Sequence, residues 1–218
     1  MAQIRFSRFL FIVFLFELQA CQPQATVPAP TPSATPVPAT EILPTIPSET
    51  TYSPKQFGLA LTVRFGPEWH VSDDLPDEFL LVGGTQSYEG AELVFMLVKD
   101  ARIADPASTA TMPWPDDFVA YLHSNRYLEV GEAIPITVGG VNGTQVDVSI
   151  TNSGERRTLI GLAVHDWFYL DYDQNWRFIM MDDVNGQRLL IGTTEAPEGF
   201  SVATDLAQEV IDSVEFLK

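Results

Sequence analysis

The chain has 218 residues, a formal net charge of −17 at pH 7 and a single cysteine. Its excess of carboxylates repels phosphate backbones, which argues against nucleic-acid binding, and would attract cations or a basic partner. One cysteine excludes a disulfide framework and any zinc or iron–sulfur site built on several cysteines.

Residues 1–20 have the organisation of a bacterial export signal. Arg5 and Arg8 form a basic start, and an apolar run over residues 9–16 follows. This run is too short to cross a bilayer as a permanent helix. We therefore expect residues 1–20 to be a signal peptide.

Cys21 follows directly after this signal. Residues 18–21, Leu-Gln-Ala-Cys, resemble the lipobox of bacterial lipoproteins, although Gln19 and the preceding Glu17 depart from the common pattern. The resemblance implies cleavage after Ala20 and lipidation of the Cys21 sulfur. Two or three acyl chains such as palmitate would then hold the protein on an extracytoplasmic membrane surface. An ordinary secretory signal is the alternative.

Residues 22–54 contain nine prolines and few large apolar side chains. Such a composition cannot bury a core and favours an extended polyproline conformation. We therefore expect lipidated Cys21 and a disordered Pro/Thr-rich tether over residues 21–54. The remaining residues, 55–218, are enough for one globular domain.

The first half of this domain begins with strands. Apolar and small or polar residues alternate over residues 57–65, which predicts a half-buried strand. Short apolar runs at residues 79–82 and 93–98 predict two more. After two prolines, apolar residues at helical spacing predict a helix over residues 116–126.

The second half is dominated by hairpins. Asn-Gly pairs at residues 142–143 and 185–186 each separate two β-rich runs, as type I′ turns do. Residues 156–170 supply one or two further strands. A final helix is expected over residues 204–215, with Thr204 and Asp205 at its cap. The fold class is therefore α+β, with a mainly antiparallel sheet of seven to nine strands and two principal helices.

Four segments resemble the PsbP-like fold, which extrinsic photosystem subunits share with Ran-binding Mog proteins. They are Leu-Thr-Val-Arg-Phe-Gly-Pro-Glu-Trp at residues 61–69, Thr-Val-Gly-Gly-Val-Asn-Gly at 137–143, and residues 186–191 ahead of 210–216. The resemblance spans about residues 55–218 and implies a layered α+β domain that docks on a larger complex without catalysing a reaction.

One segment has the spacing of a calcium loop. Asp171, Asp173 and Asn175 match its first, third and fifth positions, and Asp182 falls at the twelfth. Trp176 occupies the sixth position, where the sharp turn of such a loop needs glycine. These four oxygen donors are the metal candidates, with calcium as the ion. The alternative is a solvated hairpin tip that holds no metal, and no other cofactor is indicated.

Aromatic residues cluster in the same region. In a strand, one set of alternating side chains enters the core, whereas the other could form an exposed platform for sugars or a protein surface. An ordinary core and strand edge is the alternative. The platform candidates are Trp167, Tyr169, Tyr172 and Trp176.

No catalytic signature accompanies these features. His70, His123 and His165 lack metal-ligand spacing, and neither a G-x-S-x-G nor an H-E-x-x-H motif occurs. The sequence favours a membrane-anchored extracytoplasmic lipoprotein that acts as a non-catalytic binding or accessory module of an envelope complex. Its partners would be the lipid bilayer and an envelope protein. The alternatives are an enzyme of unrecognised type that uses acidic residues and a structural envelope spacer.

Overall fold

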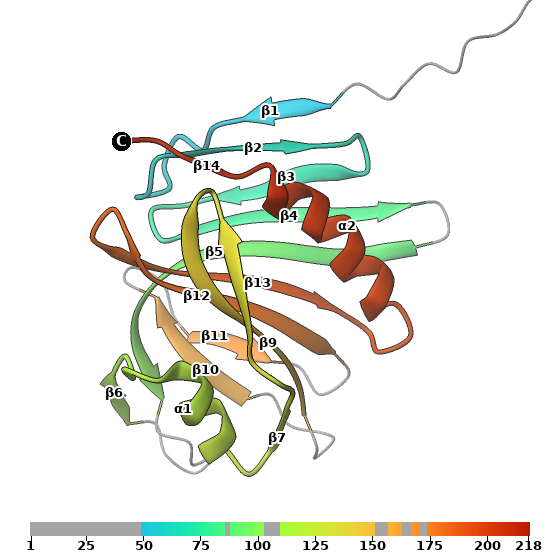
Figure 1. Cartoon of the computed structure of the whole chain (residues 1–218). Helices are drawn as coiled ribbons and strands as arrows, with labels where there is room; N and C mark the ends of the chain where they lie inside the picture. The colour runs from blue at the N-terminus through green and yellow to red at the C-terminus, as the bar shows by residue number, and fades with distance from the viewer. Residues whose placement is uncertain (1–48, 86–87, 103–109, 151–156, 163–166, 171–173) are drawn as a thin grey trace, which may run out of the picture. The chain divides into compact units, whose positions relative to one another are not determined.

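The computed structural model describes residues 49–85, 88–102, 110–150, 157–162, 167–170 and 174–218 (Figure 1). The predicted signal peptide, Cys21 and most of the predicted tether lie outside these ranges. Within them no helix is long and apolar enough to cross a membrane. The helices are α1 (Phe118–Ser124) and α2 (Phe200–Asp212). The strands are, in chain order, β1 (Thr50–Tyr52), β2 (Leu61–Phe65), β3 (Trp69–Asp74), β4 (Glu78–Thr85), β5 (Tyr88–Arg102), β6 (Thr111–Pro113), β7 (Leu128–Val130), β8 (Ile134–Val138), β9 (Val141–Ile150), β10 (Arg157–Leu162), β11 (Trp167–Leu170), β12 (Asn175–Val184), β13 (Gln187–Glu195) and β14 (Glu215–Phe216).

The strands form two antiparallel sheets. A small sheet has the order β1-β2-β14, and an eleven-stranded sheet is built on the path β11-β10-β5-β13-β12-β9-β7. The α+β class with a mainly antiparallel sheet and two principal helices is therefore confirmed. The larger sheet includes three-residue strands such as β6 and β7, which are too short to show a periodicity in the sequence.

The larger sheet is apolar on both faces. Along β12, Ile179 and Met181 enter one core with α2 and β2, whereas Phe178 and Met180 enter a second core with α1. This alternation follows from the two-residue period of a strand. Figure 1 shows α2 lying across one face of the sheet. Two apolar layers thus hold the sheet between them.

The globular unit starts before the predicted boundary at residue 55. Strand β1 pairs with β2 in the small sheet. The strand predicted over residues 57–65 is also shorter than expected, because only Leu61–Phe65 is extended and paired. Phe57 and Leu59 are buried in the same core without belonging to the strand. Their alternation reflects burial along an irregular segment.

The β8–β9 hairpin turns at a different pair of residues from the predicted one. Gly139 and Gly140 have φ values of +55° and +81°, whereas Asn142 and Gly143 lie within β9. A Cβ on Gly143 would lie 2.8 Å from the backbone oxygen of Met180. The glycine at position 143 therefore serves a close approach between strands, and the turn prediction at residues 142–143 is wrong.

The β12–β13 hairpin turns where the sequence predicts. Asn185 and Gly186 have φ values of 55° and 84°, as a type I′ turn requires. The Asp183 carboxylate accepts a hydrogen bond from the Gly186 amide at 2.8 Å. This second hairpin prediction is confirmed.

The two helices also differ in how well the sequence locates them. Helix α1 lies within the predicted range, and the Asp117 side chain caps it by accepting a hydrogen bond from the Ala120 amide at 2.8 Å. Helix α2 begins at Phe200, one turn before the predicted cap at Thr204. Thr204 is buried inside the helix, so its cap assignment is wrong. Gly199 stands at the true N-cap and offers no side-chain signal.

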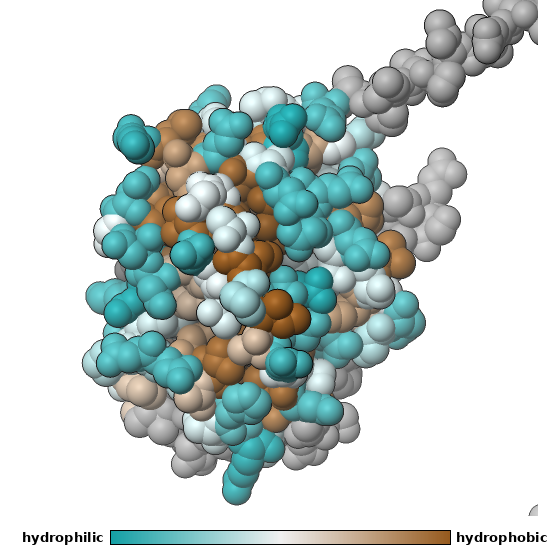
Figure 2. Space-filling model, in the orientation of Figure 1, coloured by the Kyte–Doolittle hydropathy of each residue, from teal (hydrophilic) through white to brown (hydrophobic). Residues whose placement is uncertain are grey.

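The surface carries few large apolar side chains. Among the described residues, Ile134, Val202 and Leu217 are the exposed large hydrophobics, and they belong to different segments of the chain. Figure 2 shows hydrophobic colour interspersed with hydrophilic side chains on the face that it presents. Cavities with polar linings, rather than an apolar patch, are therefore the candidate binding sites on the described surface.

Candidate functional site

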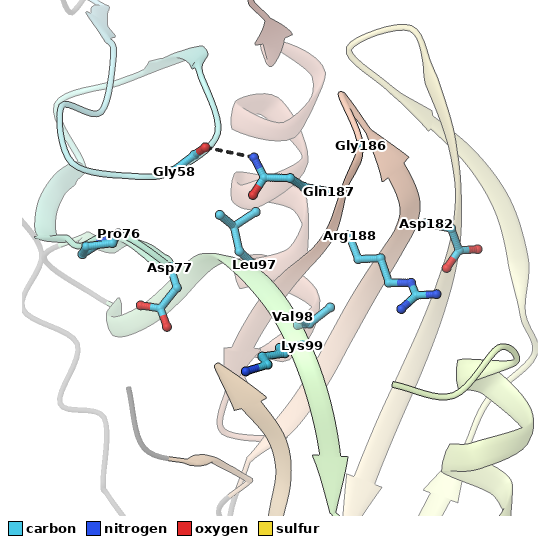
Figure 3. A pocket seen from close by; sticks show the side chains of 10 residues that line it. All are labelled: Gly58, Pro76, Asp77, Leu97, Val98, Lys99, Asp182, Gly186, Gln187 and Arg188. Carbon is cyan, nitrogen blue, oxygen red and sulfur yellow. Dashed lines mark hydrogen bonds between the residues drawn. The ribbon is translucent and has the colours of Figure 1, made fainter. Parts of the chain in front are cut away.

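An open cleft of about 630 Å³ lies beside the β12–β13 hairpin (Figure 3). Its lining comes from segments far apart in the chain: the loop at Gly58, the turn at Pro76 and Asp77, strand β5 around Lys99, and the hairpin with Arg188. A cleft assembled from several elements of one folded unit is a typical place for a binding site.

The cleft lies where strand β5 changes its neighbours. Pairing with β4 and β13 ends at Met96 and Leu97 of β5. Pairing with β10 begins at Val98, and pairing with β6 begins at Asp100. Lys99 therefore lies at the point where one set of neighbouring strands gives way to the other. A cavity can open here because β4 and β13 stop pairing with β5 before Lys99, and Lys99 has no partner in the β5–β10 register, which shifts between Gly161 and Leu162.

Hydrogen bonds fix the opposite wall of the cleft. The Gln187 side-chain amide donates to the Gly58 carbonyl at 3.0 Å, and the Gly58 amide donates to the Pro76 carbonyl at 2.8 Å. A Cβ on Gly58 would lie 2.9 Å from the Pro76 oxygen, so this wall requires glycine. The neighbouring Asp77 is almost fully buried, and its carbonyl accepts the Leu97 amide at 2.9 Å.

Two cations line the cleft without ion-pair partners among the described residues. Lys99 and Arg188 are both exposed, and the salt bridges found in the described ranges involve other side chains. Figure 3 shows Arg188 on the side of Asp182, whereas Lys99 extends from β5. The Lys99 ammonium points away from the Arg188 guanidinium in this view, so each cation can bind a carboxylate or phosphate group on its own, and Asp182 offers an acceptor beside Arg188.

The structure separates the predicted calcium ligands that it describes. Asn175 begins β12 and Asp182 lies near its other end, so the usual rise of a strand places them roughly 20 Å apart. They do not converge on one ion. Asp171 and Asp173 lie outside the described residues. In the described part of the chain, no group of three His, Cys, Asp or Glu side chains is placed to hold a metal.

One of the four residues predicted to form an exposed aromatic platform, Trp176, is buried. Trp176 is 2% exposed and stacks on Phe178 with ring centroids 5.5 Å apart. It therefore belongs to the second core, because alternation along β12 turns it inward. Trp167 and Tyr169 lie on β11, but the placement of their side chains, like all of Tyr172, lies outside what the structure describes.

The sequence patterns did not single out Lys99 or Arg188, although Asp182, which also lines the cleft, was one of the metal candidates. Lys99 directly follows an apolar strand and Arg188 follows a turn, so each has the appearance of an ordinary surface cation. They are distinguished only because both line one cavity and neither has an ion-pair partner among the described residues. No local motif in the sequence indicates that they line the same cavity.

No protein-family model and no curated protein matches this chain. Among solved structures, it is similar to cyanobacterial PsbP from Synechocystis sp. PCC 6803, with 12% identity, a TM-score of 0.43, and coverage of 79% of this chain and 94% of that one. The Ran-binding protein Mog1p of Saccharomyces cerevisiae has 8% identity and a TM-score of 0.43, with coverage of 78% and 96%.

A protein from Bacteroides thetaiotaomicron VPI-5482 has 11% identity and a TM-score of 0.36. The match covers 72% of this chain but only 45% of that structure, so the present chain spans less than half of its length. PsbP and Mog proteins are the groups that the sequence resembles. At these identities and TM-scores, the similarities carry no argument about function.

Proposed function

We propose that this protein is a non-catalytic binding or accessory module of the cell envelope, anchored to the membrane through acylated Cys21. The cleft beside the β12–β13 hairpin is its binding site, and it holds an anionic group of a partner. The observation that carries this proposal is the presence of Lys99 and Arg188 in one cavity without ion-pair partners among the described residues.

The charge of the chain makes these two cations informative. Lys and Arg number 12 against 29 Asp and Glu, so carboxylates to pair with are plentiful. Arg177 and Arg64 do pair with acidic side chains. A charge-assisted contact to a carboxylate or phosphate is stronger than a neutral hydrogen bond, and the rigid glycine wall lowers the ordering cost of binding.

The sequence of the first 54 residues supports the anchor. A signal peptide that ends at a lipobox cysteine would place lipid at Cys21, and the proline-rich residues after it would separate the globular unit from the bilayer. A lipid-anchored protein meets its partners at high local concentration. A single modest cleft is then sufficient for association.

Crosslinking in native membranes tests the proposal with the full chain. We compare the unmodified protein with the double variant Lys99→Ala/Arg188→Ala, and with Lys55→Ala/Arg126→Ala, which removes the same charge from exposed positions outside the cleft. One partner should crosslink to the unmodified protein and to the control, with at least a tenfold loss in the cleft variant, the loss expected for about 1.4 kcal/mol. The absence of an enriched partner, or equal crosslinking of both variants, contradicts the proposal.

A further inference from the structure

A second polar cavity lies on the face of the sheet that α2 covers, beside the start of that helix. Along β12, Ile179 enters the core under α2, and Arg177 and Asn175 lie on the same face because they follow at intervals of two. The sheet register places Asn175 opposite Ser149 of β9, and Ser149 opposite Glu129 of β7. A polar row therefore crosses three strands.

This row lines a cavity of about 200 Å³ together with Asp147 and Phe200. The Arg177 guanidinium forms two hydrogen bonds with the Asp147 carboxylate, at 2.8 and 2.9 Å, and lies 5.9 Å from the centre of the Phe200 ring. The bidentate pair neutralises Asp147 and fixes its orientation. Phe200 contributes the aromatic surface of the cavity.

Three further polar side chains line the cavity. The Ser149 hydroxyl and the Asn175 amide are half-buried, and Glu129 is exposed. In the described ranges, none of these side chains forms a hydrogen bond or an ion pair. The hydroxyl and the amide each donate and accept, and the carboxylate accepts only.

We propose that this cavity binds one ring of a neutral carbohydrate. Neighbouring hydroxyls of a sugar both donate and accept, which matches the hydroxyl, amide and carboxylate of the polar row, and the apolar C–H face of a sugar ring matches Phe200. An anionic ligand is disfavoured because Glu129 repels it, and the Arg177 guanidinium, 5.9 Å from the centre of the Phe200 ring, repels a cation at that ring.

The two cavities are distinct, so this inference does not depend on the proposed function. Asn175 lines the carbohydrate cavity and Asp182 lines the cleft, at opposite ends of β12. Substitutions in one cavity leave the lining of the other unchanged. The two proposals can therefore fail separately.

Saturation-transfer NMR on the purified full chain tests the inference, with glucose, galactose and N-acetylglucosamine as probes at millimolar concentration. At least one sugar should receive saturation through its ring protons. Ser149→Ala, Asn175→Ala and Glu129→Gln should each weaken its binding about fivefold, the effect of losing one hydrogen bond. Gln145→Ala, on the same face of β9 but outside the cavity, should bind as the unmodified protein does.

Glu129 is exposed, so Glu129→Gln tests the site even if a substitution at the half-buried positions disturbs folding. Saturation transfer to none of the three sugars would overturn the inference. Unchanged affinity in all three cavity variants would overturn it too, because the sugar would then bind elsewhere.

Discussion

The Asp74 carboxylate accepts a hydrogen bond from the backbone amide of Lys55 at 2.7 Å. It also accepts the amides of Gln56 and Phe57, each at 3.0 Å, and the Tyr52 hydroxyl at 3.2 Å. One side chain of β3 thus fastens the segment that enters the globular unit. Burial raises the pKa of Asp74, but the hydrogen bonds from these amides and from Tyr52 together lower it by more. The pKa of Asp74 therefore lies below its ordinary value.

Asp74→Ala should destabilise the globular unit. Three backbone amides and a phenol lose their acceptor but can reach water, so we expect a loss of about 1 to 3 kcal/mol in the free energy of unfolding. Urea unfolding measures it. Asp73→Ala is the matched control, since Asp73 accepts only the Ser72 hydroxyl among the hydrogen bonds described. Equal losses of unfolding free energy in the two variants would show that the hydrogen bonds to Asp74 make no special contribution to stability.

The contribution of Asp74 should depend on pH. Its pKa is lowered in the folded state, so the stabilisation is present above the unfolded-state pKa of about 3.9 and disappears as the pH falls through the folded-state value. The stability difference between the unmodified protein and Asp74→Ala should therefore be constant from about pH 7 to about pH 5 and shrink below about pH 4. Urea unfolding over this range tests it, and a difference that stays constant in acid contradicts the assignment.

The β8–β9 turn should depend on Gly140. Its φ is +81°, and an added Cβ would meet nothing within 4 Å, so a substitution there tests backbone conformation alone. Gly140→Ala should cost about 1 kcal/mol, and Gly140→Asn should cost less because asparagine tolerates this region. Thermal unfolding compares the two variants. An asparagine variant less stable than the alanine variant would argue against this turn geometry.

The Arg177 and Asp147 pair should contribute modestly to stability. Their side chains are 23% and 44% exposed, so solvent screens the pair, although its bidentate geometry is favourable. A double-mutant cycle with Arg177→Met and Asp147→Asn should give a coupling of about 0.5 to 1 kcal/mol. The coupling should decrease in concentrated salt. A coupling energy of zero would mean that the contact between Arg177 and Asp147 contributes nothing to stability.

Local patterns in the sequence predict the secondary structure where one residue type determines the backbone. Asn185 and Gly186 form the expected turn, and α1 lies in its predicted range with Asp117 as its cap. The start of α2 escapes prediction because Gly199 gives no side-chain cap, whereas Thr204 and Asp205 imitate one inside the helix. A local signal misleads where tertiary packing determines the outcome.

The candidate sites depend on long-range contacts and are therefore harder to predict. Trp176 was expected on an aromatic platform, but a strand can turn either set of side chains inward, and only the packing against α1 and Phe178 decides between them. The cleft joins Gly58 with Lys99 and Arg188, which lie far apart along the chain. Nothing in the spacing of these residues indicates that the fold brings them together.

Intact-mass and peptide mass spectrometry of the native protein is the most direct test of the account, because lipid at Cys21 underlies the proposed location and partner. We predict a mature chain that begins at Cys21 and carries a diacylglyceryl group on its sulfur, and we predict that this lipidated N-terminal peptide is absent when Cys21→Ser is expressed instead. A native protein that retains residues 1–20, or that has an unmodified thiol at this position, would contradict the account.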